Sequence, residues 1–395
     1  MNKDKPKKIL IFSLAYFPFV GGAEVAIKEI TDRINPEDVQ FDMVTLHLDK
    51  NIPKFEREGN VNIYRVGFTG KNVRTADLFR FPLSLNKYLL IPIGFIKALN
   101  LHRKNKYDAI WSMMATYNSF AAILFKLLNS KVKFLLTLQE GDPFEHIKKR
   151  AKPLWPLFTR IFRKADHIQV ISNYLKEFAR DMGYEGEISV VPNAVNVKHF
   201  ENFNQLRVDE IRKNLNKKED DIWLVTVSRL VYKNAVDDII GALPLLPSNI
   251  KLLILGEGPL QSKLEDLSEE LGVLNRVKFV GHIFHKDLPN YLKASDIFIR
   301  PSRSEGFGNS FVEAMAAKLP VIATDVGGIS DFLIHKKTGL VCGLNDSNDI
   351  AHKVDMYTRD INLRNEIIDN AHEMVKEKYD WDTVSIKMKD IFIKL

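Results

Sequence analysis

Residues 297–317 read IFIRPSRSEGFGNSFVEAMAA, and this stretch contains one complete strand–loop–helix unit. Its first residues are β-branched or aromatic and apolar on both faces, which predicts a strand buried under helices on two sides. Pro301 ends the strand, glycines and serines follow, and helix-forming residues begin near Ser310. This order predicts one βα unit of a parallel sheet.

The same pattern repeats along nearly the whole chain. Twelve short apolar runs, alternating with stretches of helical period, predict strands at residues 8–14, 41–46, 109–113, 133–138, 167–171, 188–191, 223–228, 251–255, 277–280, 297–301, 320–323 and 339–341. This number of strands is too large for one comfortable open sheet. The sequence therefore predicts an α/β fold with two facing Rossmann-like domains of about six strands each.

The domain boundary is expected near residues 192–196, a PNAVN segment that a polar stretch follows. Residues 1–195 then form an N-terminal domain, and residues 196–381 form a C-terminal domain. A last helix is expected at residues 382–395, and the sequence leaves open on which of the two domains it packs. In two facing Rossmann-like domains, ligands bind in the interdomain cleft beside the carboxyl ends of the strands. Functional residues are therefore expected in loops directly after strands.

The composition is that of a globular, water-soluble protein: of 395 residues, 45% are apolar and 27% are charged. The single cysteine, Cys342, excludes an intramolecular disulfide and a CxxC metal site and fits a reducing compartment. The net charge of +7 is modest for this length and does not by itself indicate nucleic acid as a partner.

The apolar stretch at residues 88–96 is far shorter than the ~18–20 residues that span a bilayer. Residues 3–17 imitate a signal peptide, but Pro18 and the helical pattern beyond it favour a buried first strand.

Two loops carry features that suit a diphosphate. Gly21 and Gly22 begin a helix, where paired glycines let the backbone approach a phosphate and N–H groups favour an anion. A plain glycine turn is the alternative. Arg229 and Lys233 follow the strand at 223–228, where Arg229 can chelate two oxygens and Lys233 supplies a point charge. The alternative here is two solvated surface charges.

The loop after residues 251–255 reads GEGPLQ, from Gly256 to Gln261. It begins like the dinucleotide-binding GxGxxG motif, but Gln261 replaces the third glycine. Glu257 would also repel a pyrophosphate. A tight strand-to-helix turn is the favoured interpretation, and a nicotinamide-dependent oxidoreductase is the disfavoured alternative.

The most informative loop holds two glutamates, Glu305 before the helix and Glu313 in its first turns. Between them, Gly308, Asn309 and Ser310 offer backbone N–H groups for a phosphate or a sugar hydroxyl. Carboxylates accept hydrogen bonds from vicinal hydroxyls, so the pair could grip a ribose and a hexose. The alternative, a capping and a solvated glutamate, is disfavoured because Glu305 is expected to be an unpaired acid buried among Phe307, Phe311 and Val312.

Glu305 and Glu313 form an E-x7-E motif, and at this point the chain resembles the large family of retaining glycosyltransferases with the GT-B fold, numbered four in the usual scheme. The resemblance covers nearly the whole chain and is strongest over residues 225–341. The other segments that carry it are Gly21–Glu24, Ser228–Leu230 with Lys233, Gly281–Ile283, Ser295–Ser302 and Pro320–Gly328.

The resemblance implies that Arg229, Lys233 and Glu305 are the catalytic residues. Arg229 and Lys233 would neutralise the donor's diphosphate, Glu313 would bind the ribose, and Glu305 would hold the donor sugar. Family members transfer the sugar with retention and without an obligatory metal, so no cofactor or metal site is expected. Further implied donor contacts are Gly21, Gly22, Gln139, Asp142, Gly256, His282, Ile283, Gly306, Phe307, Gly308, Asn309 and Ser310.

The sequence departs from the family pattern at several positions. Gln139 stands where many relatives have a histidine that touches the donor sugar, and Glu140 or Asp142 are candidates to replace that contact. Asn234 follows Lys233 where glycine is usual, which is tolerable because asparagine also visits positive φ. Asp331 and Lys318 replace a common glutamate and a common glycine. None of these changes removes the Arg229–Lys233 pair or the two glutamates, so an active enzyme is expected.

Positive charge is concentrated in two segments of the N-terminal half. Residues 146–164 contain seven Lys or Arg and no acid, and residues 80–106 mix aromatic and aliphatic residues with further cations. Basic amphipathic segments with aromatics are typical of helices on an anionic membrane. The alternative is that the aromatics pack on the sheet and the cations face water. The candidate membrane or acceptor residues are Lys148, Lys149, Arg150, Trp155, Arg160 and Arg163.

These observations predict a cytoplasmic retaining hexosyltransferase, peripheral on the inner face of the membrane. It would move a hexose from a UDP- or GDP-sugar to a hydroxyl of a lipid-linked or anionic glycan, because the N-terminal half of the GT-B fold binds the acceptor. Nucleic acid is not expected as a partner. The alternative is a GT-B protein that binds a nucleotide-sugar in a regulatory role and has lost turnover.

Overall fold

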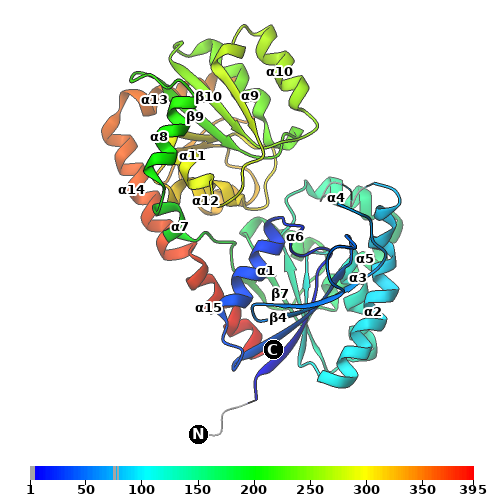
Figure 1. Cartoon of the computed structure of the whole chain (residues 1–395). Coiled ribbons are helices and arrows are strands. Elements are labelled where there is room, and N and C mark those ends of the chain that lie inside the picture. The colour runs from blue at the N-terminus through cyan, green and yellow to red at the C-terminus, as the bar shows by residue number, and fades with distance from the viewer. Residues whose placement is uncertain (1–4, 74–76, 78–79) are drawn as a thin grey trace. The chain divides into compact units, whose positions relative to one another are not determined.

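The computed structural model of the chain describes residues 5–73, 77 and 80–395 (Figure 1). The chain divides into two compact units. The first comprises Met1–Asn193 and Trp381–Leu395, and the second comprises Ala194–Asp380. The division after Asn193 lies two residues before the expected boundary at 195, and the C-terminal helix belongs to the first unit.

The first unit contains an eight-stranded sheet with the order β3-β4-β2-β1-β5-β6-β7-β8. Of its described strands, β3 alone runs antiparallel, against β4, and the other neighbours pair in parallel. The central strands are almost entirely buried, as helices on both faces require. The strands are β1 (Lys7–Phe12), β2 (Val39–Leu46), β3 (Phe55–Glu58), β4 (Val61–Val66), β5 (Ala109–Met113), β6 (Lys133–Leu138), β7 (His167–Val170) and β8 (Ile188–Val190).

Helices cover both faces of this sheet. The β1-to-β2 connection crosses the sheet in the direction opposite to the β4-to-β5, β5-to-β6 and β6-to-β7 connections, so right-handed crossovers place α1 on one face and α2, α3 and α5 on the other. Helix α15 packs on α1, β1 and β2. The helices are α1 (Gly22–Arg33), α2 (Asn86–Asn105), α3 (Tyr117–Leu128), α4 (Phe144–Ala151), α5 (Trp155–Arg163), α6 (Asn173–Asp181) and α15 (Trp381–Lys394).

The second unit contains a six-stranded parallel sheet with the order β11-β10-β9-β12-β13-β14. Its core joins the buried faces of β9, β10 and β12 to α9, α10 and α13. The strands are β9 (Ile222–Val227), β10 (Ile250–Leu255), β11 (Val277–Gly281), β12 (Ile297–Arg300), β13 (Val321–Ala323) and β14 (Leu340–Val341). The helices are α7 (Val197–Glu201), α8 (Gln205–Asn214), α9 (Val236–Ala242), α10 (Gln261–Glu270), α11 (Leu288–Ala294), α12 (Asn309–Ala316), α13 (Ser347–Arg359) and α14 (Ile361–Lys378).

Short 3₁₀ helices complete the connections. They lie at η2 (Leu83–Leu85), η3 (Lys152–Leu154), η4 (Tyr232–Asn234), η5 (Leu243–Leu245), η6 (Leu274–Arg276) and η7 (Gly327–Asp331).

The prediction of an α/β fold with two parallel, Rossmann-like sheets is confirmed, and every predicted strand is present within two residues at each end. The expectation of about six strands in each domain is wrong for the first unit, which also contains β3 and β4. The sequence of β3 is FERE, and its residues are all exposed or half-exposed, so it lacks the continuous apolar run that marked the other strands. In β4, buried residues alternate with half-buried ones, which is the pattern of a strand near a sheet edge.

Candidate active site

The predicted donor residues of the second unit gather at one edge of its sheet. The loops that carry them follow β9, β10, β11 and β12 directly. Because all four strands are parallel, their carboxyl ends lie at the same edge. This edge is therefore the place where the topology brings chemical groups together.

A cavity of about 250 Å³ opens at this edge. Its lining unites four predicted donor residues, Arg229, Gly256, His282 and Ile283. Glu257 also lines it, and its Oε1 accepts the backbone N–H of His282 at 3.3 Å. The other lining residues are Val227, Ser228, Leu255 and Leu288.

The glycines of the GEG segment let two loops pack backbone against backbone. Gly256 has a φ of 137°, and a Cβ atom there would lie 1.9 Å from the carbonyl oxygen of Ser228. At Gly258, a Cβ atom would lie 2.4 Å from the carbonyl oxygen of Leu230. The Gly256 N–H donates to the carbonyl of Gly281 at 2.8 Å. The interpretation of this segment as a tight strand-to-helix turn is confirmed.

Lys233 lies on η4, which a neighbouring arginine holds in place. The backbone N–H of Arg303 donates to the carbonyl of Lys233 at 2.7 Å. The Arg303 guanidinium also donates to the carbonyl of Tyr232 at 2.8 Å and forms ion pairs with Asp237 and Asp238 on α9. These bonds fix the Lys233 backbone relative to the loop after β12.

Glu305 is buried, as predicted, but the expectation that it is unpaired is wrong. Its Oε2 accepts from Arg300 Nη2 at 2.5 Å, and its Oε1 accepts the backbone N–H of Gly306 at 3.0 Å. Arg300 is the last residue of β12, so its buried side chain reaches forward into the loop. A charged residue at the end of an otherwise apolar strand was the signal in the sequence that this pairing existed.

Arg300 contacts two further segments of the site. Its Nη1 donates to Ser310 Oγ at 2.9 Å, and its Nη2 donates to Asn234 Oδ1 at 2.9 Å. Asn234 in turn donates from Nδ2 to the carbonyl of Arg229 at 2.7 Å. The hydroxyl of Ser310 is therefore engaged by an arginine inside the protein.

The residues between the two glutamates form the entry to α12. Gly308 has a φ of 88°, and a Cβ atom there would lie 2.5 Å from the ring of Phe311. Asn309 begins the helix, whose first-turn amides are the groups that can receive an anion or a hydroxyl. Phe307 is buried against the rings of Phe332 and Tyr379, so only its backbone can contact a donor.

Glu313 has a partner that sequence reasoning missed. Its Oε1 lies 3.2 Å from Nε2 of His285, which is in the loop after β11. The His285 ring stacks on His199 with 5.3 Å between the ring centroids. No spacing in the sequence marks this contact, because the two residues lie 28 positions apart.

The predicted site residues of the first unit lie in other loops. Gly21 caps α1, and its N–H donates to Glu24 Oε2 at 2.7 Å, so this amide is already engaged. Burial raises the pKa of Glu24 above its ordinary value. Gln139 follows β6, and its Oε1 accepts from Asn193 Nδ2 at 3.3 Å.

The neighbours of Gln139 differ in their environment. Glu140 is buried, and its Oε1 accepts the backbone N–H of Ala115 at 2.7 Å, which fastens the loop after β5. Asp142 is half-buried just before α4. Glu140 therefore has a structural contact of its own within the first unit.

The predicted basic residues lie on α4 and α5. Lys149, Arg160 and Arg163 are exposed, and Trp155 is half-buried against Phe158, with 5.8 Å between the ring centroids. Lys148 is half-buried and lies 3.4 Å from Glu145. The side chain of Arg150 lies outside the described part of the structure.

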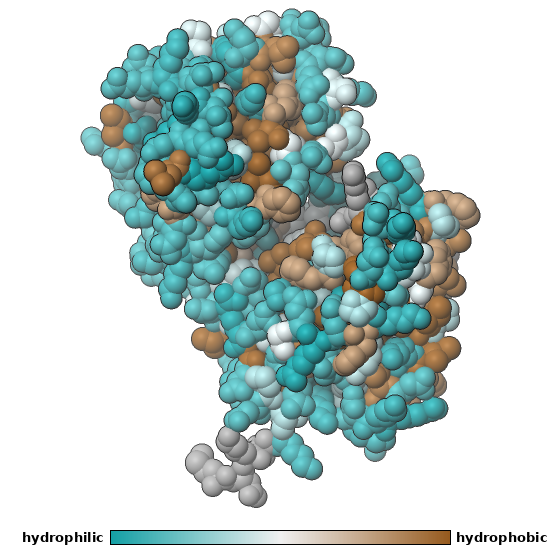
Figure 2. All heavy atoms as spheres, viewed as in Figure 1, coloured by the Kyte–Doolittle hydropathy of each residue, from teal (hydrophilic) through white to brown (hydrophobic). Residues whose placement is uncertain are grey.

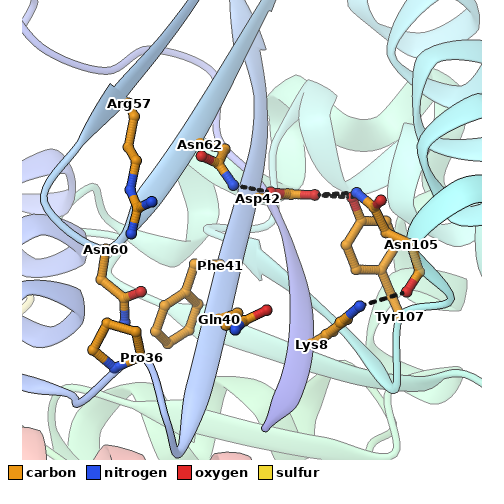
Figure 3. Close-up of a pocket in the computed structure, with 10 residues that line it drawn as sticks. All are labelled: Lys8, Pro36, Gln40, Phe41, Asp42, Arg57, Asn60, Asn62, Asn105 and Tyr107. Carbon is orange, nitrogen blue, oxygen red and sulfur yellow. Dashed lines mark hydrogen bonds between the residues drawn. The ribbon is translucent and has the colours of Figure 1, made fainter.

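A second cavity, of about 240 Å³, lies in the first unit where β1, β2 and β4 meet the end of α2 (Figure 3). Asp42 lies at its centre and accepts hydrogen bonds from Asn62 Nδ2 at 2.8 Å, from Asn105 Nδ2 at 2.6 Å and from the Tyr107 hydroxyl. Burial and this carboxylate raise the pKa of Tyr107. The hydrogen bonds to Asp42 fasten the end of α2 to the sheet.

Over 5–73, 77 and 80–395, no three or more His, Cys, Asp or Glu side chains are grouped so that they could hold a metal ion. In the same ranges, no helix is long and apolar enough to cross a bilayer.

Two family models match the chain. Glycosyltransferase Family 4 matches residues 20–199, and Glycosyl transferases group 1 matches residues 207–374. The chain belongs to glycosyltransferase family 4. It is therefore a glycosyltransferase, and its two units are the halves of the GT-B fold.

Other glycosyltransferases resemble the chain in sequence. An uncharacterised glycosyltransferase of Methanocaldococcus jannaschii is 26% identical over 392 residues, which are 98% of this chain and 97% of that protein. A GDP-mannose-dependent α-(1-6)-phosphatidylinositol monomannoside mannosyltransferase of Mycobacterium tuberculosis is 30% identical over 242 residues, 58% of this chain and 62% of that protein.

Solved structures share the fold. Sucrose-phosphate synthase of Thermosynechococcus elongatus has a TM-score of 0.82 at 21% identity over 98% of both chains. The Anabaena protein HepE in complex with UDP-glucose has a TM-score of 0.79 at 18% identity, over 98% of this chain and all of that chain.

Proposed function

We propose that this family-4 glycosyltransferase transfers a hexose from UDP- or GDP-sugar to an acceptor hydroxyl with retention of configuration. The observation that carries the proposal is the cavity of about 250 Å³ at the edge of the second sheet, lined by Arg229 and flanked by the loop that holds Glu305. Similar solved structures hold UDP and UDP-glucose, and one relative uses GDP-mannose.

Each group has a defined role in the proposed reaction. The bond between the anomeric carbon and the diphosphate oxygen breaks, and the acceptor oxygen bonds to that carbon from the same face. The departing diphosphate takes up the hydroxyl proton. Arg229 and Lys233 stabilise the negative charge that develops on the diphosphate. Glu305 and the amides of Gly308, Asn309 and Ser310 hold the sugar, and Glu313 binds the ribose.

The proposed reaction needs no metal ion, because Arg229 and Lys233 supply the positive charge that a metal would otherwise bring to the diphosphate. The same activity in EDTA and in magnesium supports this part of the proposal. Loss of activity in EDTA and its return with magnesium contradict it, and they leave the donor class unaffected.

A thermal-shift panel of UDP, GDP, ADP, dTDP and NAD, without metal and then with magnesium, tests the donor class. A ligand at 100 times its dissociation constant adds about 2.7 kcal/mol to the free energy of unfolding. We expect one nucleoside diphosphate to raise Tm without metal and Lys233→Ala to abolish that shift. A shift with NAD alone contradicts the proposal.

The second candidate is a GT-B protein that binds the nucleotide-sugar without turnover. Release of UDP or GDP from the matching sugar nucleotide separates the two candidates. The enzyme loses this release in Glu305→Gln and keeps nucleotide binding. If the wild type binds the nucleotide but releases no UDP or GDP with any lipid or glycan acceptor, the second candidate is correct.

We also propose that the acceptor is a lipid-linked or anionic glycan and that the protein works peripherally on the inner face of an anionic cytoplasmic membrane. Helices α2, α3 and α5 contain seven Lys or Arg residues and no acidic residue. One of the seven, Lys126 of α3, is largely buried and paired with Asp166, so the other six supply the positive charge of this surface. Helix α3 contacts both α2 and α5, so the three form one continuous face. Attraction to anionic lipids is worth about 1 kcal/mol for each cation near the surface.

Apolar side chains are exposed on the same face, and Figure 2 shows hydrophobic atoms gathered over α2. Exposed apolar side chains beside cations suit an interfacial surface, where the apolar groups enter the acyl boundary. The exposed apolar residues are Leu85, Tyr88, Leu89, Ile93, Ile96, Leu124, Leu127, Leu128, Leu154 and Leu157.

Flotation with phosphatidylcholine vesicles that do or do not contain phosphatidylglycerol tests the membrane proposal. We expect binding only to the anionic vesicles and a reduction of at least fivefold in Arg160→Glu/Arg163→Glu, because the variant reverses two charges on α5. The matched control is Arg207→Glu/Lys213→Glu, which also reverses two charges, on α8 of the second unit. Equal flotation of the wild type and the α5 variant contradicts the proposal.

A further inference from the structure

The guanidinium of Arg300 is buried in the second unit, with only 10% of its side chain exposed. A buried charge costs several kcal/mol unless its partners compensate, and an apolar side chain of similar size often serves the fold equally well. The partners of Arg300 therefore indicate what the charge is for.

Those partners come from three different segments, and two of them, Glu305 and Ser310, are predicted donor residues. Nη2 donates to Glu305 Oε2 at 2.5 Å and to Asn234 Oδ1 at 2.9 Å. Nη1 donates to Ser310 Oγ at 2.9 Å, at the start of α12. The guanidinium carbon also lies over the ring of Phe311, 5.3 Å from its centroid.

Asn234 extends this set to the cationic loop. Its Nδ2 donates to the carbonyl of Arg229 at 2.7 Å while its Oδ1 accepts from Arg300. One amide side chain thus connects the loop of Arg229 and Lys233 to the guanidinium that holds Glu305. A glycine at residue 234 could form neither bond.

We infer that Arg300 and Asn234 are positioning residues that hold the sugar-binding Glu305 in register with the diphosphate-binding Arg229 and Lys233. The inference rests on the proposed donor site. Neither residue needs to touch the donor. Arg300 fixes the direction of the Glu305 carboxylate, and Asn234 fixes the distance between that carboxylate and the cationic loop.

Arg303 provides a matched control from the same loop. Its side chain is 11% exposed and forms ion pairs with Asp237 and Asp238, neither of which belongs to the donor site. Substitution of Arg303 therefore disturbs a buried ion pair of similar exposure without changing a partner of Glu305. Its guanidinium also bonds to η4 beside Lys233, but Lys233 is proposed to meet the diphosphate, which both ligands of a pair share.

The test compares binding of UDP with UDP-glucose, and of GDP with GDP-mannose, by titration calorimetry on the full chain. The readout is the ratio of the two dissociation constants in the pair that the wild type binds. A loss of folded protein lowers the number of sites for both ligands equally and leaves this ratio unchanged. A misplaced Glu305 changes the ratio, because only the sugar nucleotide meets it.

We expect Arg300→Lys and Asn234→Ala to weaken sugar-nucleotide binding about tenfold relative to the nucleoside diphosphate, which corresponds to the loss of one charged hydrogen bond. Arg303→Lys should leave the ratio within threefold of the wild type. Asn234→Ala keeps the Arg300–Glu305 pair, so it remains informative if Arg300→Lys does not fold.

Two outcomes contradict the inference, and they differ in what they say of the donor site. If the wild type binds a donor pair and Asn234→Ala has the ratio of Arg303→Lys, the positioning role is wrong and the proposed function stands. If the wild type binds neither pair, the proposed donor site itself fails, and the inference fails with it.

Discussion

At the scale of single residues, the candidate site depends on positions where the backbone of one loop touches the backbone of another. The closest such contact is at Gly256, where any side chain would meet the carbonyl oxygen of Ser228 at 1.9 Å. Gly256 also lines the cavity, together with Arg229 and His282. The same glycine therefore lets two loops pack together and forms part of the lining of the proposed donor site.

We expect Gly256→Ala to lower the free energy of unfolding of the second unit by about 2 kcal/mol or more, because it combines a positive φ with a backbone clash. It should also abolish the thermal shift by the nucleoside diphosphate. Gly272→Ala is the control, since Gly272 has a φ of 68° but no atom within 4 Å of its added Cβ. In that variant the free energy of unfolding should fall by about 1 kcal/mol, and the nucleoside diphosphate should still raise Tm. Equal effects of the two substitutions would show that φ alone matters.

Asp49 predicts a pH dependence in the first unit. Its carboxylate accepts the backbone N–H groups of Asn51 at 2.9 Å and Val73 at 2.8 Å, and these bonds lower its pKa below the ordinary value of 3.8. A depressed pKa stabilises the folded state above pH 3.8 and loses that effect as the pH falls through the lowered value.

Asp49→Asn should therefore destabilise the protein at pH 7, and the difference from the wild type should shrink as the pH falls below 3.8. Urea unfolding at a series of pH values measures this. Asp38→Asn is a second-site control with a side-chain ion pair to Lys389, at 2.7 Å, in place of backbone bonds. If the free energies of unfolding of Asp49→Asn and the wild type differ by the same amount from pH 7 to pH 3, the stabilisation does not come from the ionised carboxylate.

At the scale of elements, the strands and the loops after them could be predicted because buried parallel strands have a continuous apolar sequence. The Glu305–Glu313 loop could be placed for the same reason, since it directly follows such a strand. What the sequence did not reveal are contacts between segments distant in sequence, such as Arg300 with Asn234 or His285 with Glu313. No local period or spacing encodes them.

The exposed leucines at the end of α3 belong to the same class of missed features. The sequence of α3 is apolar nearly throughout, so it reads as a buried helix. In the structure, Leu127 and Leu128 are 54% and 67% exposed, because the helix covers the sheet with its other side. Only the packing of α3 on α2 and α5 determines which of its leucines face outward.

Leu127→Ser/Leu128→Ser should reduce flotation with anionic vesicles at least threefold, because two side chains no longer enter the acyl boundary. Leu206→Ser on α8, where the leucine is 82% exposed, is the control and should float like the wild type. Both proteins should retain the Tm of the wild type within about 2 °C, since exposed substitutions change stability little. If the double variant floats like the wild type, these leucines do not enter the membrane, and attraction between charges alone accounts for binding.

At the scale of the whole molecule, each unit has its own sheet and core, and the chain visits the first unit twice. Helix α15 returns to it and buries Phe392 against Phe41 and Trp111, with ring centroids 5.4 and 5.0 Å apart. Ion pairs of Lys389 with Asp38 and of Arg33 with Asp382 lie beside this contact. The last helix is thus part of the core of the first unit.

We expect Phe392→Ala to lower the free energy of unfolding of the first unit by about 3 kcal/mol or more, as removal of a buried phenylalanine does. Binding of the nucleoside diphosphate should persist, because its proposed residues belong to the second unit. Ile393→Ala, at a 45% exposed position, is the neighbouring control and should change stability by less than about 0.5 kcal/mol. Calorimetry with and without the nucleotide separates the two transitions.

The return of α15 also has a consequence for biosynthesis. Chains generally fold domain by domain as they leave the ribosome, with the N-terminal domain first. Here Phe41 and Trp111 are made before the second unit, but the helix that covers them is made after it. The second unit, residues 194–380, is complete before the first one can close. The first unit, although its translation begins earlier, therefore completes its core only after the second unit has been synthesised.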